Sequence, residues 1–140
     1  MTYDAKAQMV IRRPVADVFE AFVDPDVTTN FWFTKSSGRL VPGQRVTWTW
    51  EMYDAHADVL VKEVEQDQRI LVEWDGYGTT PIEWIFTPAG NGTFVQITNS
   101  AIDTVQNALD STGGFNLMLA GAKCYLEHGI RLNLVTDHMP

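Results

Sequence analysis

The feature that most constrains the fold is a long stretch, residues 36–99, in which apolar and polar residues alternate. In Gln44–Met52, for example, Val46, Trp48 and Trp50 are separated by polar residues. A period of two places every second side chain on the same face of a β-strand. Similar runs follow, separated by short segments rich in Gly, Pro and Asn. The stretch therefore predicts six successive strands with one buried face, which short turns join into a mostly antiparallel sheet.

The residues before this stretch predict one more strand and two short helices. Lys6–Arg13 has strand character, and Pro14 ends it. In Val15–Val23 the apolar residues recur at helical spacing. Asp24-Pro25 predicts the start of a second short helix, with Phe31–Phe33 near its end.

The C-terminal part predicts a long helix. We expect it to begin at Ser111 or Thr112 and to end near Leu134, after a separate helical turn at Asp103–Leu109. Its apolar face consists of Phe115, Leu119, Ala122, Leu126 and Ile130. The order of elements indicates a single α+β domain over residues 1–140, because the length leaves no room for two ordinary domains.

Charge and cysteine content exclude several classes of protein. The formal net charge is −8, which disfavours nucleic acids and anionic membrane surfaces as partners. Cys124 is the single cysteine, so an intrachain disulfide is excluded, and its expected place in the middle of a helix indicates an inert thiol. The sequence shows no signal-peptide pattern and no apolar run of membrane-spanning length. We therefore expect a soluble cytoplasmic protein with no membrane insertion.

The aromatic residues of the strands are the main candidates for a function. Five tryptophans occur in 140 residues, and four of them follow the strand alternation. A concave wall of indole rings opposite a helix face of small residues predicts an apolar cavity for a small hydrophobic or aromatic molecule. The alternative is that these rings fill the space and leave no cavity. The expected lining residues are Phe31, Phe33, Trp48, Trp50, Val61, Trp74, Trp84, Phe86, Ile97, Asn99, Phe115, Leu119 and Ala122.

Four polar residues accompany the aromatic set. Asn99 is in phase with the apolar residues of its strand, so it should point inward, where a buried amide needs a ligand, a water or a protein group as partner. Glu51 and Glu83 are out of phase and should face solvent. Tyr77 lies in a loop between two glycines, and it either closes over an entrance or is simply exposed.

No other pattern indicates a metal, a cofactor or a catalytic centre. Asp54, His56 and Asp58 alternate as ligands on one strand face would, but the segment begins in a predicted turn and no further His or Cys pattern supports it. The sequence lacks a phosphate-binding loop, a dinucleotide fingerprint and a nucleophile elbow. We expect no metal and no cofactor, and we identify no catalytic residue.

Three pairs of segments, in this order along the chain, carry a resemblance to a known superfamily. They are Pro14–Pro25 with Phe31–Phe33, Val72–Trp74 with Gly92–Thr98, and Gly114–Leu119 with Tyr125–Gly129. The sequence resembles the SRPBCC superfamily, and most of all its branch named after the activator of the ninety-kilodalton heat-shock protein ATPase. The resemblance implies a helix-grip fold, in which a curved, mostly antiparallel sheet of seven strands wraps around a long C-terminal helix. It also implies two short helices between the first two strands.

The resemblance leaves three functions open. The first is binding of a small hydrophobic molecule. The second is a cyclase or hydrolase, with Asn99, Tyr77, Glu83 and His56 as the available helpers; many relatives have a His or an acid where Asn99 stands, which disfavours acid–base chemistry there. The third is a co-chaperone, which is disfavoured because eukaryotic co-chaperones of this branch use an additional N-terminal domain. Many relatives have Trp in place of Phe115, a conservative difference. The sequence does not decide between a monomer and a homodimer.

Overall fold

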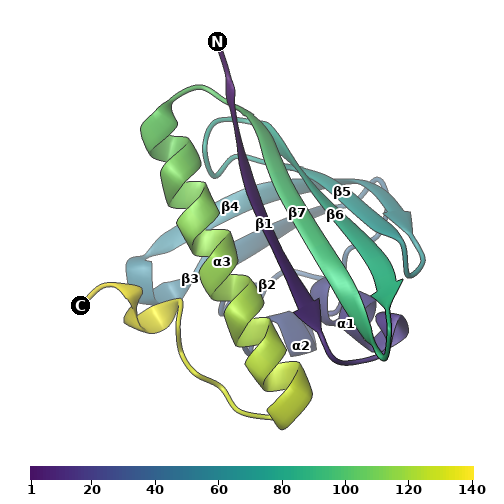
Figure 1. Cartoon of the computed structure of the whole chain (residues 1–140). Coiled ribbons are helices and arrows are strands. Elements are labelled where there is room, and N and C mark those ends of the chain that lie inside the picture. Colours follow the sequence, from purple (N-terminus) through teal and green to yellow (C-terminus); the bar gives the residue numbers. More distant parts are fainter.

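The computed structural model describes every residue of the chain, 1–140, and has an α+β architecture (Figure 1). The strands are β1 (Tyr3–Ile11), β2 (Lys35–Ser36), β3 (Arg45–Trp50), β4 (Ala55–Glu65), β5 (Arg69–Trp74), β6 (Thr80–Ala89) and β7 (Gly92–Ile102). The helices are α1 (Val15–Val23), α2 (Pro25–Thr28) and α3 (Val105–His128), and short 3-10 turns occupy Glu51–Tyr53 and Thr136–His138.

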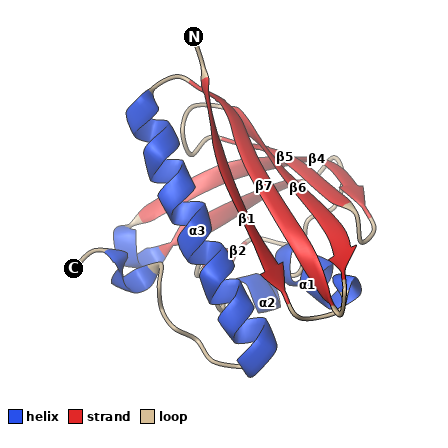
Figure 2. Cartoon of the chain, viewed as in Figure 1, coloured by secondary structure: helices blue, strands red, loops and turns tan.

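The seven strands form one antiparallel sheet in the order β1-β7-β6-β5-β4-β3-β2. Figure 2 shows the sheet curving around α3, with α1 and α2 at the end of the sheet near the last residues of β1. The predicted helix-grip fold is therefore confirmed. None of the helices combines the length and the apolar character that crossing a bilayer requires.

The alternation of the sequence becomes the two faces of the sheet. In β6, Ile82 and Trp84 are almost completely buried in the core. Glu83, between them, points outward and accepts a hydrogen bond from Arg69 Nε on β5 at 2.6 Å. The prediction that this glutamate lies outside the interior is confirmed.

Two local features of the sheet agree with the sequence. In the sequence, the alternation through Val59 and Val61 changes phase before Val64, and the structure has a bulge there, because the register between β4 and β5 shifts between Val61 and Glu63. The turn between β6 and β7 consists of Gly90 and Asn91 alone, and Gly90 has a φ of 59°. A positive φ of this kind suits glycine, which has no Cβ.

The second helix is shorter than the sequence predicted. Asp24 caps it by accepting a hydrogen bond from the backbone N–H of Asp26 at 3.0 Å. The helix ends at Thr28, whose hydroxyl donates back to the carbonyl of Asp24 at 3.0 Å. Phe31–Phe33 therefore lie in the turns after the helix, where all three are buried. The prediction that the helix carries them was wrong.

Both predicted ends of the C-terminal helix were also wrong. The helix begins at Val105, because Thr104 accepts a hydrogen bond from the backbone N–H of Asn107 at 3.1 Å and caps it there. It ends at His128, because Gly129 adopts a left-handed conformation with φ 70°. Residues 130–140 form a tail that turns back beside the helix (Figure 1).

The centre of the core is an indole that the strand pattern does not include. Trp32 follows α2, and its ring centroid lies 4.8 Å from that of Trp48 and 6.1 Å from that of Trp84. It also lies 5.7 Å from Trp50 and 6.4 Å from Trp74. One side chain thus joins the rings of β3, β5 and β6 into a single aromatic cluster.

The last turns of α3 are fastened to the end of β1. Lys123 Nζ donates to the carbonyl of Val10 at 2.9 Å, and the backbone N–H of Arg12 donates to Glu127 Oε2 at 2.8 Å. Lys123 and Glu127 form an ion pair at 2.6 Å. Burial raises the pKa of Glu127, but the hydrogen bonds from Arg12 and Lys123 outweigh it, so the pKa lies below its usual value.

Candidate functional site

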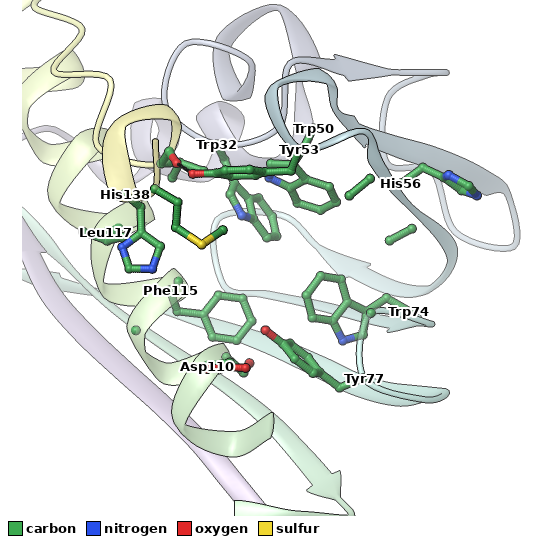
Figure 3. A pocket seen from close by; sticks show the side chains of 18 of the residues that line it. Trp32, Trp50, Tyr53, His56, Trp74, Tyr77, Asp110, Phe115, Leu117 and His138 are labelled. Atoms are coloured by element: carbon green, nitrogen blue, oxygen red, sulfur yellow. Dashed lines mark hydrogen bonds between the residues drawn. The ribbon is translucent and has the colours of Figure 1, made fainter. Parts of the chain in front are cut away.

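A cavity of about 530 Å³ opens between the first half of α3, the β3–β4 connection, the β5–β6 loop and the C-terminal tail (Figure 3). Nineteen residues line it, and 12 of them are hydrophobic. A volume of this size is in the range of small-molecule sites. A cavity between the sheet and the long helix is therefore present, beside the first half of α3.

Aromatic rings form most of the cavity wall. Trp74 is central: its ring stacks on Phe115 of α3 with centroids 6.1 Å apart, and it meets Tyr77 edge-on at 5.8 Å. Trp50 and Trp32 continue the wall, with their centroids 5.7 Å apart. The wall thus combines rings from β3, β5, the β5–β6 loop, α3 and the segment after α2.

The thirteen residues expected to line the cavity divide into two groups. Trp50, Trp74 and Phe115 lie on the cavity wall. The other ten do not line it, and the structure places them in the packed core: Phe31, Phe33, Trp48, Val61, Trp84, Phe86, Ile97, Asn99, Leu119 and Ala122. The reason is that other aromatic rings fill the deeper part of the gap. Trp32 lies against Trp48 and Trp84, and Phe22 of α1 lies against Trp84 and Phe86. In that deeper part, the protein's own aromatic rings fill the space and leave no cavity, as the alternative interpretation of the sequence had it.

Asn99 points inward as predicted and is completely buried, but protein groups satisfy it. Its amide donates to Thr80 Oγ1 at 2.8 Å and to the carbonyl of Pro81 at 2.9 Å. Its Oδ1 accepts from the hydroxyl of Ser111 at 3.0 Å. These bonds tie β6, β7 and α3 together, and they leave the amide no free donor for a ligand.

The C-terminal tail supplies wall residues that sequence reasoning missed. Val135, His138 and Met139 all line the cavity. The hydroxyl of Tyr53 holds the tail in place by donating to the carbonyl of Val135, with the carbonyl of Thr136 at 3.3 Å. No sequence signal pointed to this wall, because these residues follow the expected helix end near Leu134 and have no periodic pattern.

Six further missed residues lie on α3. The cavity wall includes Leu109, Asp110, Ser111, Gly113, Gly114 and Leu117 of this helix. Asp110, Gly114 and Leu117 are spaced by four and three residues, so they share one face of the helix. The sequence held this spacing, but the helix was expected to begin only after Asp110.

The polar groups of the cavity are few. Burial and the negative charge of Asp110 raise the pKa of Tyr77, which keeps its phenol protonated as a hydrogen-bond donor. His138 faces the interior, whereas the ring of His56 points away from it (Figure 3). Glu51 lies outside and forms an exposed ion pair with Lys35 at 3.4 Å.

The β5–β6 loop covers Trp74 very closely. A Cβ on Gly76 would lie 2.9 Å from three atoms of the Trp74 indole, a distance that side chains do not tolerate. Trp74 Nε1 is buried and has no acceptor in the protein. An unpaired buried donor is uncommon, and here it lies in a ring of the cavity wall.

Solved structures share this architecture. The crystal structure of the protein SSP2350 from Staphylococcus saprophyticus is 36% identical, with a TM-score of 0.83, and the match covers 93% of this chain and 96% of that one. The Aha1 dimer from Colwellia psychrerythraea is 19% identical, with a TM-score of 0.82 and coverage of 91% and 98%. CalU16 from Micromonospora echinospora is 14% identical, with a TM-score of 0.74 and coverage of 99% and 91%. The last two likenesses concern the fold alone.

The sequence matches no curated protein. One protein family matches it, over residues 12–127, which is most of the chain from the end of β1 to the last turn of α3. The chain therefore belongs to the Activator of Hsp90 ATPase homolog 1-like family of the SRPBCC superfamily.

Proposed function

We propose that this protein binds a small hydrophobic or aromatic molecule in the cavity beside the first half of α3. The observation that carries the proposal is the cavity itself, with a volume of about 530 Å³ and a wall made mainly of aromatic rings. Such rings offer large apolar contact area at fixed positions, which is typical of ligand sites. The expected ligand contacts are Trp50, Trp74 and Phe115, together with Trp32 and Tyr77.

The glycines of α3 support this proposal. Gly113 and Gly114 lie inside the helix, where each costs up to about 1 kcal/mol relative to Ala. No atom lies within 4 Å of a Cβ built on either of them, so close packing does not require them. Gly121, in contrast, packs with its Cβ position 3.4 Å from Phe31. Bare backbone at Gly114 leaves room on the cavity wall for a bound molecule.

An enzymatic function finds less support. Of the four helpers considered, Asn99 is fully bonded, Glu83 lies on the outer face, and the ring of His56 points away from the cavity. Tyr77 remains, and its raised pKa suits a hydrogen-bond donor better than a base at neutral pH. The residues of the cavity therefore support ligand binding better than they support catalysis.

The proposed site can be tested by a substitution on α3 that places a side chain in the cavity. Gly114→Leu adds a branched side chain to the cavity face of α3 where no atom blocks a Cβ. Asn116→Leu is the matched control, because it adds the same side chain to an exposed position of the same helix outside the cavity. The probe is 2-naphthylmethanol, a neutral bicyclic compound, and calorimetry measures its dissociation constant. The indole N–H signals of the five tryptophans in a ¹⁵N-labelled sample locate the bound compound.

We expect the Gly114→Leu variant to fold normally and to bind the probe at least about tenfold more weakly, because lost ligand contacts of about 1.4 kcal/mol correspond to that factor. The Asn116→Leu variant should bind like the wild type. Equal binding by all three proteins, or probe-induced shifts confined to indoles outside the cavity, would contradict the proposed site.

A further inference from the structure

The cavity wall has a negatively charged side chain but no Lys or Arg. Among its 19 lining residues there is no Lys and no Arg, and the single carboxylate belongs to Asp110. Asp110 has no Lys, Arg or His nitrogen within 4.0 Å, and its side chain accepts one hydrogen bond, from Gln106 Nε2 at 3.1 Å. No cationic side chain of the protein therefore pairs with this carboxylate.

This carboxylate shares the cavity wall with the rings of Phe115, Trp74 and Tyr77. In the view of Figure 3, the hydroxyl end of Tyr77 is directed toward the side on which Asp110 and Phe115 are drawn. The charge of Asp110 also acts on the Tyr77 phenol, whose pKa it helps to raise. Trp74 adjoins both rings, with its centroid 5.8 Å from Tyr77 and 6.1 Å from Phe115. One carboxylate and three ring systems therefore surround the same corner of the cavity.

Both kinds of group attract positive charge. The face of an aromatic ring carries negative electrostatic potential and attracts a cation within about 6 Å of its centroid. A carboxylate adds a direct Coulombic attraction, which is stronger beside low-dielectric protein than in bulk water. An anionic ligand, in contrast, would meet the carboxylate with no Lys or Arg on the wall to bind it, in a protein of formal net charge −8.

We propose that this cavity selects cationic ligands, namely small aromatic or apolar molecules that carry an ammonium group, with Asp110 and the rings of Tyr77, Trp74 and Phe115 receiving the charge. The inference rests on the proposed binding function and adds the charge class of the ligand. The apolar part of such a molecule occupies the side of the cavity formed by Trp50, Trp32 and the tail. The ammonium group lies at the corner where Asp110 stands.

The test compares three probes that share one ring system. They are 2-naphthylmethylammonium, 2-naphthylmethanol and 2-naphthoate, which are cationic, neutral and anionic at pH 7. Calorimetry at low ionic strength measures their dissociation constants. We expect the cation to bind about tenfold more tightly than the neutral alcohol, as a partly desolvated cation–π contact with a carboxylate nearby allows, and the anion to bind most weakly. Added salt should weaken only the binding of the cation.

Two pairs of variants assign the selectivity to residues. Asp110→Asn removes the carboxylate, and Glu65→Gln removes one exposed negative charge that is not on the cavity wall. Asp110→Asn should reduce cation affinity about three- to fivefold and leave the alcohol within twofold, because exposed charge pairs contribute modestly. Tyr77→Phe keeps the ring and should keep the preference for the cation, whereas Tyr77→Leu should reduce it.

The outcomes separate the two proposals. If the alcohol binds at the cavity and the cation binds no better, the charge class is refuted while the binding function stands. If none of the three probes binds at the cavity, both proposals fail. An equal loss of cation affinity in Asp110→Asn and Glu65→Gln would also refute the role of Asp110, since it would reduce the effect to net charge.

Discussion

The buried amide of Asn99 should stabilise the fold strongly and contribute nothing directly to ligand binding. Its three hydrogen bonds reach Thr80, Pro81 and Ser111, and both side-chain partners are almost completely buried. Asn99→Ala removes all three bonds, each with a net value of about 1 kcal/mol, and leaves buried donors or acceptors without partners. We therefore expect the free energy of unfolding to fall by about 3 kcal/mol, a large share of the roughly 5–15 kcal/mol typical of a domain.

Urea unfolding followed by circular dichroism measures this loss. Gln96→Ala, at an exposed position of the same strand, is the control and should change the free energy of unfolding by less than about 0.5 kcal/mol. The double variant Asn99→Ala/Ser111→Ala should be less destabilised than the two single changes added together, because the two residues share a hydrogen bond. A loss below about 1 kcal/mol, or full stability combined with lost probe binding, would refute the structural role assigned to Asn99.

Two further predictions concern other positions. Gly76→Ala should lower the melting temperature and shift the Trp74 indole signal, because its Cβ would lie 2.9 Å from that ring; Gly113→Ala, where no atom lies within 4 Å, should raise the free energy of unfolding by up to about 1 kcal/mol. Thermal melts of both variants test the reasoning: the melting temperature should fall for Gly76→Ala and rise for Gly113→Ala. Glu127 has a lowered pKa in the folded protein, so its contribution to stability is present above its unfolded value of 4.5 and is lost as the pH falls through the folded pKa. Urea unfolding from neutral pH to pH 3 should therefore show a smaller acid-induced loss in Glu127→Gln than in the wild type, and identical slopes would contradict this.

The sequence was sufficient for the sheet because alternation is a local pattern. A residue such as Ile82 or Trp84 must face inward if its strand forms, whatever the rest of the chain does. Glu83 and Asn99 followed from the same rule, and the structure agrees for both. The bulge near Val64 was visible for the same reason.

The helix ends escaped prediction because local signals competed. Ser111 and Thr112 offered a possible helix start, but the residue that caps the helix is Thr104, further upstream. At the other end, Ile130 continued the helical spacing although Gly129 ends the helix. Both errors concern which of two plausible boundary residues the chain uses.

The wall of the cavity was only partly predictable because it depends on contacts between distant segments. Trp50, Trp74 and Phe115 followed from strand and helix periodicity. Trp32 lies in a turn with no periodicity, and its position is set by the rings of three strands. The tail reaches the cavity through the bond from Tyr53 to Val135, which joins residues 82 positions apart.

The pairing of β1 with β7, and the fastening of α3 onto β1, bear on how the chain folds during synthesis. The ribosome makes β1 first, yet its neighbours in the sheet and above it are the last strand and the last helix. Until those elements emerge, β1 has an unpaired edge and an uncovered apolar side, and closing so long a loop slows folding. During synthesis, the exposed first strand should therefore bind chaperones, and stalled fragments that lack α3 should aggregate through the unpaired edge of β1.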